Sequence, residues 1–126
     1  MTRKKRTDKI FFRYYEIPRD SYVLALFGEE WNRKYGSEGE SLHFHNHLEV
    51  GYCYKGEGVI KLENGDYPYF PQTFTMIPKN CPHSTFGDQG GINSWEFLFI
   101  DVERFLADCQ ALLEQTYQNH LKAVGI

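Results

Sequence analysis

The central part of this chain is a series of short segments with β-strand character, separated at close and even spacing by turn-forming residues. Asn64 and Gly65 lie between two of these segments, and an Asn-Gly pair there is a strong hairpin signal because both residues tolerate positive φ. Many short strands joined by tight turns are typical of a β-sandwich or β-barrel. We therefore expect an all-β domain with strands or extended arms at residues 11–17 and 22–27, and strands at residues 42–45, 49–54, 59–62, 67–70, 73–77 and 95–100.

Length and composition favour a single folded domain. The 126 residues are 41% hydrophobic and 17% aromatic, and aromatic rings fit the pleated, half-buried surface of a sheet. This length allows one domain with a core and is too short for two of ordinary size. Residues 95–100 are apolar nearly throughout, which predicts a strand covered on both faces. We expect residues 10–126 to form the domain and residues 1–9, with their basic run, to form a mobile N-terminus.

Charge and hydropathy argue against two classes of partner. The formal net charge of −3 lacks the positive field that concentrates nucleic acid, so this segment alone is not expected to bind DNA. No apolar stretch approaches the ~18 residues of a membrane span, and no signal-peptide core follows the basic run. The three cysteines are odd in number and widely separated, which does not indicate a disulfide framework. We expect a cytoplasmic protein that makes no membrane contact.

The hydrophobic period changes after Asp101. Apolar side chains then recur at intervals of three and four, which predicts an amphipathic helix over about residues 102–122 with Asp101 as its N-cap. The apolar stripe could pack back on the sheet or pair with the same helix of a second subunit in a homodimer. No second helix of comparable strength follows, so a helix-turn-helix motif cannot be assembled from these residues.

Metal-ligand side chains are concentrated in two segments. His43, His45, His47 and Glu49 fall within seven residues, and His83 follows some thirty residues later. Imidazole nitrogens and carboxylate oxygens are ligands of divalent transition metals, and a set of three imidazoles and one carboxylate suits zinc, iron, manganese or nickel. Alternate side chains of a strand share a face, so His43 and His45 should project side by side. The sequence thus indicates a metal site.

Two alternatives remain open at this cluster. If one strand ran through residues 43–49, His47 would share the face of the other ligands, whereas a turn at Asn46 and His47 would bring Glu49 in from a neighbouring strand. We favour His43 and His45 over His47 as ligands. The same residues could instead form a metal-free pocket for an anionic or hydroxylated small molecule, or a purely structural cluster.

The residues around His43 resemble the first cupin motif, G(x)5HxH(x)3-4E(x)6G. The match includes both histidines, Glu49 and the closing Gly56, while Ser37 occupies the position of the opening glycine. The second motif, G(x)5PxG(x)2H(x)3N, matches at its proline and histidine, and its other three positions differ: Pro78 and His83 match, and Gln72, Asn80 and Gly87 do not. The resemblance implies a cupin-type double-stranded β-helix, a jelly-roll barrel, whose metal ligands are His43, His45, Glu49 and His83.

Within the cupins, residues 42–106 are more closely similar to the N-terminal effector-sensing domain of AraC-family transcriptional regulators. This similarity implies a ligand-sensing and dimerisation domain with a small-molecule effector, such as a sugar, in the barrel. Family members carry a double helix-turn-helix domain after the sensor, through which they contact DNA. That domain is missing from this sequence, and the helix at residues 102–122 would lead towards it.

Aromatic faces suit a sugar or an aromatic effector. Tyr14, Tyr52, Tyr54 and Trp95 are therefore candidate pocket walls, although ordinary β-core positions would explain them equally well. The second functional class is a stand-alone cupin enzyme, such as a dioxygenase or isomerase, in which the bound ion acts as a Lewis acid or oxygen-binding centre. No additional acid or base stands at motif spacing, so we expect a sensor without catalytic residues.

Overall fold

The computed structural model describes residues 9–27, 32–33, 40–88 and 91–126. Residues 1–8 of the predicted mobile N-terminus lie outside these ranges. Ser37 of the first motif also lies outside them. The described elements, in chain order, are β1 (Phe11–Arg13), β2 (Val23–Leu26), β3 (Asn32–Arg33), β4 (His43–His45), β5 (Leu48–Lys55), β6 (Gly58–Leu62), β7 (Gly65–Tyr69), β8 (Phe74–Ile77), β9 (His83–Gly87), β10 (Asn93–Ile100) and α1 (Val102–Ala123).

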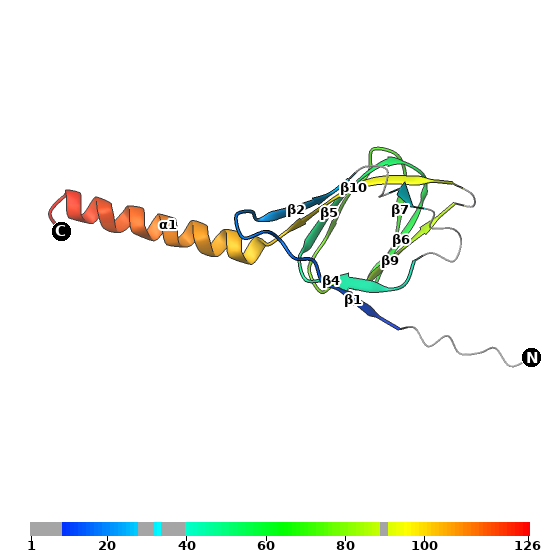
Figure 1. Cartoon of the computed structure of the whole chain (residues 1–126), viewed down its shortest axis with the longest axis horizontal. Coiled ribbons are helices and arrows are strands. Elements are labelled where there is room, and N and C mark those ends of the chain that lie inside the picture. Colours follow the sequence, from blue (N-terminus) through cyan, green and yellow to red (C-terminus); the bar gives the residue numbers. More distant parts are fainter. Residues whose placement is uncertain (1–8, 28–31, 34–39, 89–90) are drawn as a thin grey trace, which may run out of the picture.

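The strands form two sheets that face each other (Figure 1). The first sheet has the order β1-β4-β9-β6-β7 and the second has the order β2-β10-β5-β8, with β3 also paired to β10. Apolar side chains from both sheets fill the space between them, among them Cys53, Ile60, Tyr69, Ile77 and Trp95. The predicted all-β architecture with one C-terminal helix is confirmed.

The strands depart most from the predictions at three places, and other strand ends differ by one or two residues. Residues 14–17 are not in a strand, so the first predicted segment shortens to β1. The pattern of apolar residues predicts neither β3 nor β9. In β9 the inward positions are taken by polar side chains, since His83 and Thr85 are buried there, and Ser84 between them is buried as well. A search for apolar alternation cannot detect such a strand.

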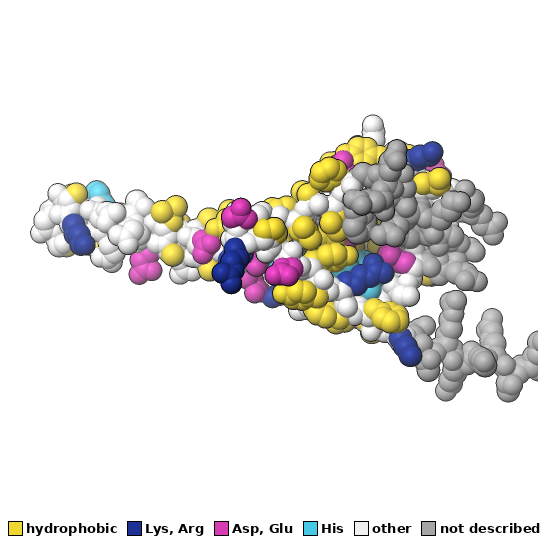
Figure 2. Space-filling view, viewed as in Figure 1, with side chains coloured by type: hydrophobic (Ala, Val, Ile, Leu, Met, Phe, Trp, Pro, Cys, Tyr) yellow, Lys and Arg dark blue, Asp and Glu magenta, His cyan; other side chains and the backbone are white. Residues whose placement is uncertain are grey.

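The prediction that residues 95–100 are covered on both faces is wrong. Trp95 and Phe99 are buried on the inner face of β10, but Leu98 on the outer face is 39% exposed and Glu96 is exposed beside it. The outer face therefore presents apolar side chains to solvent, and Figure 2 shows hydrophobic side chains at the surface of the barrel.

The turn that follows β5 depends on Gly56. Its φ is +104°, a backbone conformation that side chains rarely adopt, and a Cβ at this position would lie 2.1 Å from Asn93 Oδ1. The same Oδ1 accepts a hydrogen bond of 2.8 Å from the buried Tyr69 hydroxyl. The closing glycine of the first motif thus allows the backbone of the turn to lie against the start of β10.

The helix α1 begins at a well-formed N-cap, because the Asp101 carboxylate accepts a hydrogen bond from the backbone N–H of Arg104. Tyr22 holds its first turns: its hydroxyl donates to Asp108, its ring lies under the Arg104 guanidinium, and Phe105 packs edge-on against it. Lys79 also pairs with Glu103. These contacts fix the direction in which the helix leaves the barrel.

Beyond these contacts, α1 extends away from both sheets (Figures 1 and 2). None of its described residues is buried, and Leu113 in the predicted stripe is 69% exposed. Of the two arrangements left open by the sequence, packing back on the sheet of the same chain is therefore not found. Within the described ranges, no helix has both the length and the apolar character that crossing a membrane requires.

Candidate metal centre

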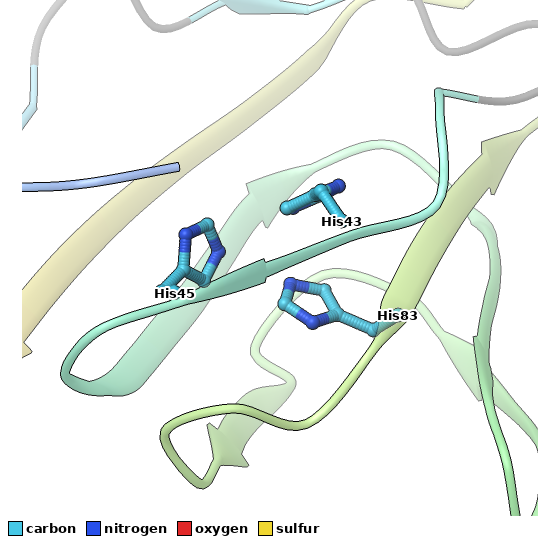
Figure 3. Close-up of side chains that lie close together, drawn as sticks. All are labelled: His43, His45 and His83. Carbon is cyan, nitrogen blue, oxygen red and sulfur yellow. The ribbon is translucent and has the colours of Figure 1, made fainter. Parts of the chain in front are cut away.

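Two strands of the first sheet bring three histidines together. His43 and His45 are alternate residues of β4, and both are buried on its inner side. His83 is the first residue of β9, directly opposite His43 in antiparallel register. Figure 3 shows the three imidazole rings converging from these two strands. The predicted alternation of His43 and His45 and the long-range partner His83 therefore meet at one point.

The distances are those of a potential metal site. Each of the three histidines offers a ring nitrogen, and these nitrogens all lie within 4.8 Å of one another. Glu49 enters from β5, and its Oε2 lies 2.7 Å from His45 Nε2 and 3.3 Å from His83 Nε2. All four side chains are buried. The three-histidine cluster could hold a metal ion, and Glu49 lies against two of its members.

Backbone carbonyls orient two of the rings. His43 Nδ1 lies 2.8 Å from the carbonyl oxygen of Ser41, and His83 Nδ1 lies 2.9 Å from that of Cys81. A carbonyl only accepts, so each Nδ1 carries the proton and leaves the lone pair of Nε2 directed into the cluster. This is the arrangement that metal-binding histidines use, in which one nitrogen is anchored and the other is free to coordinate.

The remaining ring nitrogens lack good partners. Among the described residues, His83 Nε2 and both ring nitrogens of His45 are buried without a hydrogen bond, although Glu49 approaches closely. Buried polar atoms are normally hydrogen-bonded, and leaving one unpaired costs about 1–3 kcal/mol. Imidazole nitrogens with this deficit suit a divalent transition metal. The residues present therefore fit such an ion.

Burial and the neighbouring charges act differently on His43, Glu49 and His83. Burial lowers the pKa of His43 to about 3, so this ring is neutral at physiological pH. Burial would raise the pKa of Glu49, but the adjacent His45 and His83 outweigh it and hold this pKa below its usual range. Burial opposes protonation of His83 as well, yet the carboxylate of Glu49 raises its pKa on balance.

His47, the alternative ligand, lies outside the cluster. Asn46 and His47 form the turn between β4 and β5, and His47 Nε2 is 3.1 Å from the carbonyl oxygen of Tyr15 and 3.0 Å from Asn46 Nδ2. The strand therefore does not run straight through residues 43–49. His47 holds the chain that follows β1 against this turn.

In the part of the chain that the structure describes, the four aromatic residues suggested as pocket walls do not face one cavity. Trp95 is part of the core and stacks on Phe97, and Tyr14 is 68% exposed. Tyr52 and Tyr54 lie on the outer face of the second sheet, where they line a groove of about 510 Å³. Trp95 pairs with Cys53, whereas Tyr52 pairs with Glu96, so these two aromatic side chains face opposite sides of the sheet.

Three residues near the cluster were not among the predicted site residues. Tyr15 stacks on Phe99, with ring centroids 4.1 Å apart, and its ring lies 5.3 Å from that of His45. Glu40 lies 3.9 Å from His43 Nε2, and Arg13 lies 3.7 Å from Glu40. The sequence offered one indication of these residues. Arg13 and Tyr15 are alternate residues of the first predicted extended segment, so their side chains would lie on the same face.

This chain is similar to curated proteins in sequence and to solved proteins in structure. The chain is 42% identical to L-ectoine synthase from Vibrio campbellii over 43 residues, which are 33% of this chain and 34% of that protein. It thus spans about a third of the length of the curated relatives it matches. Among solved structures, an RmlC-like cupin from Shewanella frigidimarina is 17% identical, with 66% of this chain and 68% of that chain covered and a TM-score of 0.45.

A second solved structure is an RmlC-like cupin family protein with a double-stranded β-helix fold from Methanocaldococcus jannaschii, at 16% identity, with 68% and 87% of the two chains covered and a TM-score of 0.46. The expected fold class, two facing sheets with one C-terminal helix, is confirmed by the arrangement of the strands themselves. The profile of the AraC-like ligand binding domain matches residues 32–122, which is most of the chain. This protein therefore belongs to the family of AraC-like ligand binding domains.

Proposed function

We propose that this chain is the ligand-sensing and dimerisation domain of an AraC-type transcriptional regulator, with a divalent transition metal in its effector site. One observation carries the proposal: three buried histidines place ring nitrogens within 4.8 Å of one another inside a barrel of the AraC-like family, and among the described residues two of them, His45 and His83, have ring nitrogens without a hydrogen bond. His43, His45, His83 and Glu49 would hold the ion, and zinc, iron, manganese and nickel all accept such a set.

The chain's own residues prepare this site before any ion enters. The carbonyls of Ser41 and Cys81 hold two rings in the tautomer that coordinates, and the Glu49 carboxylate stays ionised beside the other ligands. A bound divalent ion would supply a Lewis-acid position for an oxygen of the effector. The family implies a small-molecule effector. The contacts at the base of α1 would let a change in the barrel reach the helix.

The reading frame beyond codon 126 tests the regulatory role. A frame that continues into two helix-turn-helix motifs would join the sensor to a DNA reader, as the proposal expects. A stop codon directly after Ile126 would instead favour an independent cupin and would count against regulation through DNA.

The second candidate is a metal-dependent cupin enzyme. Two observations favour it: the similarity to L-ectoine synthase over 43 residues, and Glu40 beside the cluster, an acid whose pKa is raised by burial. We prefer the sensor because the family match covers most of the chain, whereas the similarity to the enzyme covers a third of it. Turnover of a substrate by the purified, metal-loaded chain would reverse this preference.

We expect the exposed stripe of α1 to pair with the same helix of a second copy. Leu113→Glu places a charge in this stripe and should shift the protein from dimer to monomer, because the charge would be buried without a partner in the interface. Sedimentation velocity measures the change. Gln118→Glu on the opposite side of the helix is the matched control and should leave the dimer intact. If neither variant differs from the parent protein, α1 is not the dimer contact.

Metal affinity should decrease as the pH falls. Ligand histidines must be neutral, and His83, whose pKa is raised, retains its proton to a higher pH than an ordinary histidine. Below that pKa, the proton on His83 competes with the ion and should weaken the apparent affinity by about tenfold or more per pH unit, while His43, with a pKa of about 3, adds no competition in this range. Titration against a chromophoric chelator at a series of pH values measures this. Occupancy that stays constant down to pH ~4.5 would show that these imidazoles are not the ligands.

A further inference from the structure

β1 places an arginine on the face of the first sheet that carries the histidines. The strand pairs in parallel with β4, and Arg13 lies opposite His45. Paired residues of neighbouring strands project to the same side, and the contact between Phe12 and Phe44 occupies the other side. The Arg13 side chain is 42% exposed, whereas that of His45 is 3% exposed. Arg13 therefore extends from the buried cluster to solvent, and Figure 2 shows histidine atoms at the surface beside basic and acidic side chains.

A single carboxyl group separates this guanidinium from the cluster. One oxygen of Glu40 lies 3.7 Å from Arg13 Nη1, and the other lies 3.9 Å from His43 Nε2. Both distances are longer than a direct hydrogen bond, and the hydrogen bond of the Glu40 carboxyl goes to the Thr85 side chain. Glu40 thus does not engage the two parallel donors of the guanidinium, which are the groups that bind a carboxylate in a bidentate pair.

The charges of the loaded site favour an anion. A divalent ion and Arg13 supply three positive charges, and Glu49 and Glu40 supply two negative charges. One positive charge is left over, which matches a carboxylate better than a doubly charged phosphate. Arginine also recognises planar carboxylates through its fixed fork of donors.

We propose that the effector is a small carboxylic acid, whose carboxylate pairs with Arg13 while a neighbouring oxygen of the same molecule reaches the metal. This inference rests on the proposed metal site. The gap of one carboxyl group between Arg13 and His43 limits it to short molecules in which the two oxygen groups are close together, such as 2-hydroxy acids.

The test uses cobalt-loaded protein, whose visible absorption reports on the coordination of the ion. Glycolate and its neutral counterpart glycolamide are titrated separately, and glycolate should change the spectrum at a concentration at least tenfold lower. Arg13→Gln should weaken glycolate at least tenfold and leave the cobalt content unchanged. Arg19→Gln, at an exposed arginine in the loop after β1, is the matched control and should bind glycolate as the parent protein does.

A second variant separates recognition of the anion from simple neutralisation of Glu40. Glu40→Gln removes a negative charge next to the proposed ligand and should strengthen glycolate binding several-fold. If Arg13 only balances Glu40, Arg13→Gln will not change the affinity for glycolate, and the inference is overturned. Equal responses to glycolate and glycolamide would also overturn it. The failure of the metal site itself would appear separately, as an absence of cobalt in elemental analysis. Should Arg13→Gln not fold, the comparison of glycolate with glycolamide on the parent protein decides the question.

Discussion

His45→Ala should reduce the bound transition metal from close to one ion per chain to almost none. The ring of His45 lies 4.9 Å from that of His83 and its Nε2 is 2.7 Å from Glu49 Oε2, and neither of its ring nitrogens has a hydrogen bond among the described residues. Its removal leaves only two imidazoles and one carboxylate as ligands, and one coordination position has no protein ligand. Elemental analysis of protein expressed with added metal measures the result.

The loss of the metal should also lower the stability of the folded protein. A ligand that binds only the folded state at a hundred times its dissociation constant adds about 2.7 kcal/mol to the free energy of unfolding. A strong chelator should therefore lower the melting temperature of the parent protein and have little effect on His45→Ala. His47→Ala is the control, because His47 lies in the same turn region but outside the cluster, and it should keep its metal. Full metal content in His45→Ala would contradict the proposed centre.

Gly56→Ala should destabilise the fold by about 3 kcal/mol or more. The change combines two costs. A side chain in this backbone conformation costs about 1–3 kcal/mol. The overpacked contact also costs about 1–3 kcal/mol. The new methyl group would lie 2.1 Å from Asn93 Oδ1 and 3.1 Å from the Asn93 Cα, so a side-chain rotation alone cannot relieve the clash. Urea denaturation monitored by circular dichroism gives the difference in unfolding free energy.

Gly65→Ala separates these two costs. Gly65 also has a positive φ, +147°, but nothing lies within 4 Å of where its Cβ would be. This variant should therefore lose only the conformational part, about 1–3 kcal/mol. Equal losses in the two variants would mean that the segment around Asn93 moves aside without cost, and that Gly56 is needed for its backbone angles alone.

The candidate centre was more predictable from sequence than the strand that carries part of it. His83 was identified by its match to a motif, which records residue types at fixed spacing and does not depend on strand prediction. β9 itself was missed because its buried positions are polar. Where a strand serves a site, the side chains that face inward are chosen for their chemistry, and the hydrophobic alternation that reveals a strand is lost.

Sequence parity separates the suggested pocket walls onto two faces of the sheet. Within β5, Glu49 and Cys53 share one face, so Tyr52 and Tyr54 must lie on the other. The aromatic composition of these positions drew attention to them, but composition carries no information about direction. The outward tyrosines and the inward Trp95 belong to different environments of one sheet.

The pairing of Arg13 with Glu40 could not be predicted from local patterns. It depends on β1 lying parallel to β4, a contact between segments separated by some thirty residues of chain. No turn signal specifies a parallel pair, because its two strands are joined by a long connection. The residues that surround the cluster on its solvent side therefore emerged only from the three-dimensional arrangement.

The way α1 leaves the barrel has a mechanical consequence. The helix continues directly from β10, whose Phe99 ring lies 5.0 Å from that of His45, and the Asp101 N–H is bonded to the Tyr22 carbonyl at its base. With 22 residues, at about 1.5 Å of rise each, α1 is a lever of roughly 33 Å. A tilt of about 5° at the base of the helix would displace its C-terminal end by roughly 3 Å. Sub-ångström movements around the imidazoles would therefore become larger movements at the C-terminal end of α1.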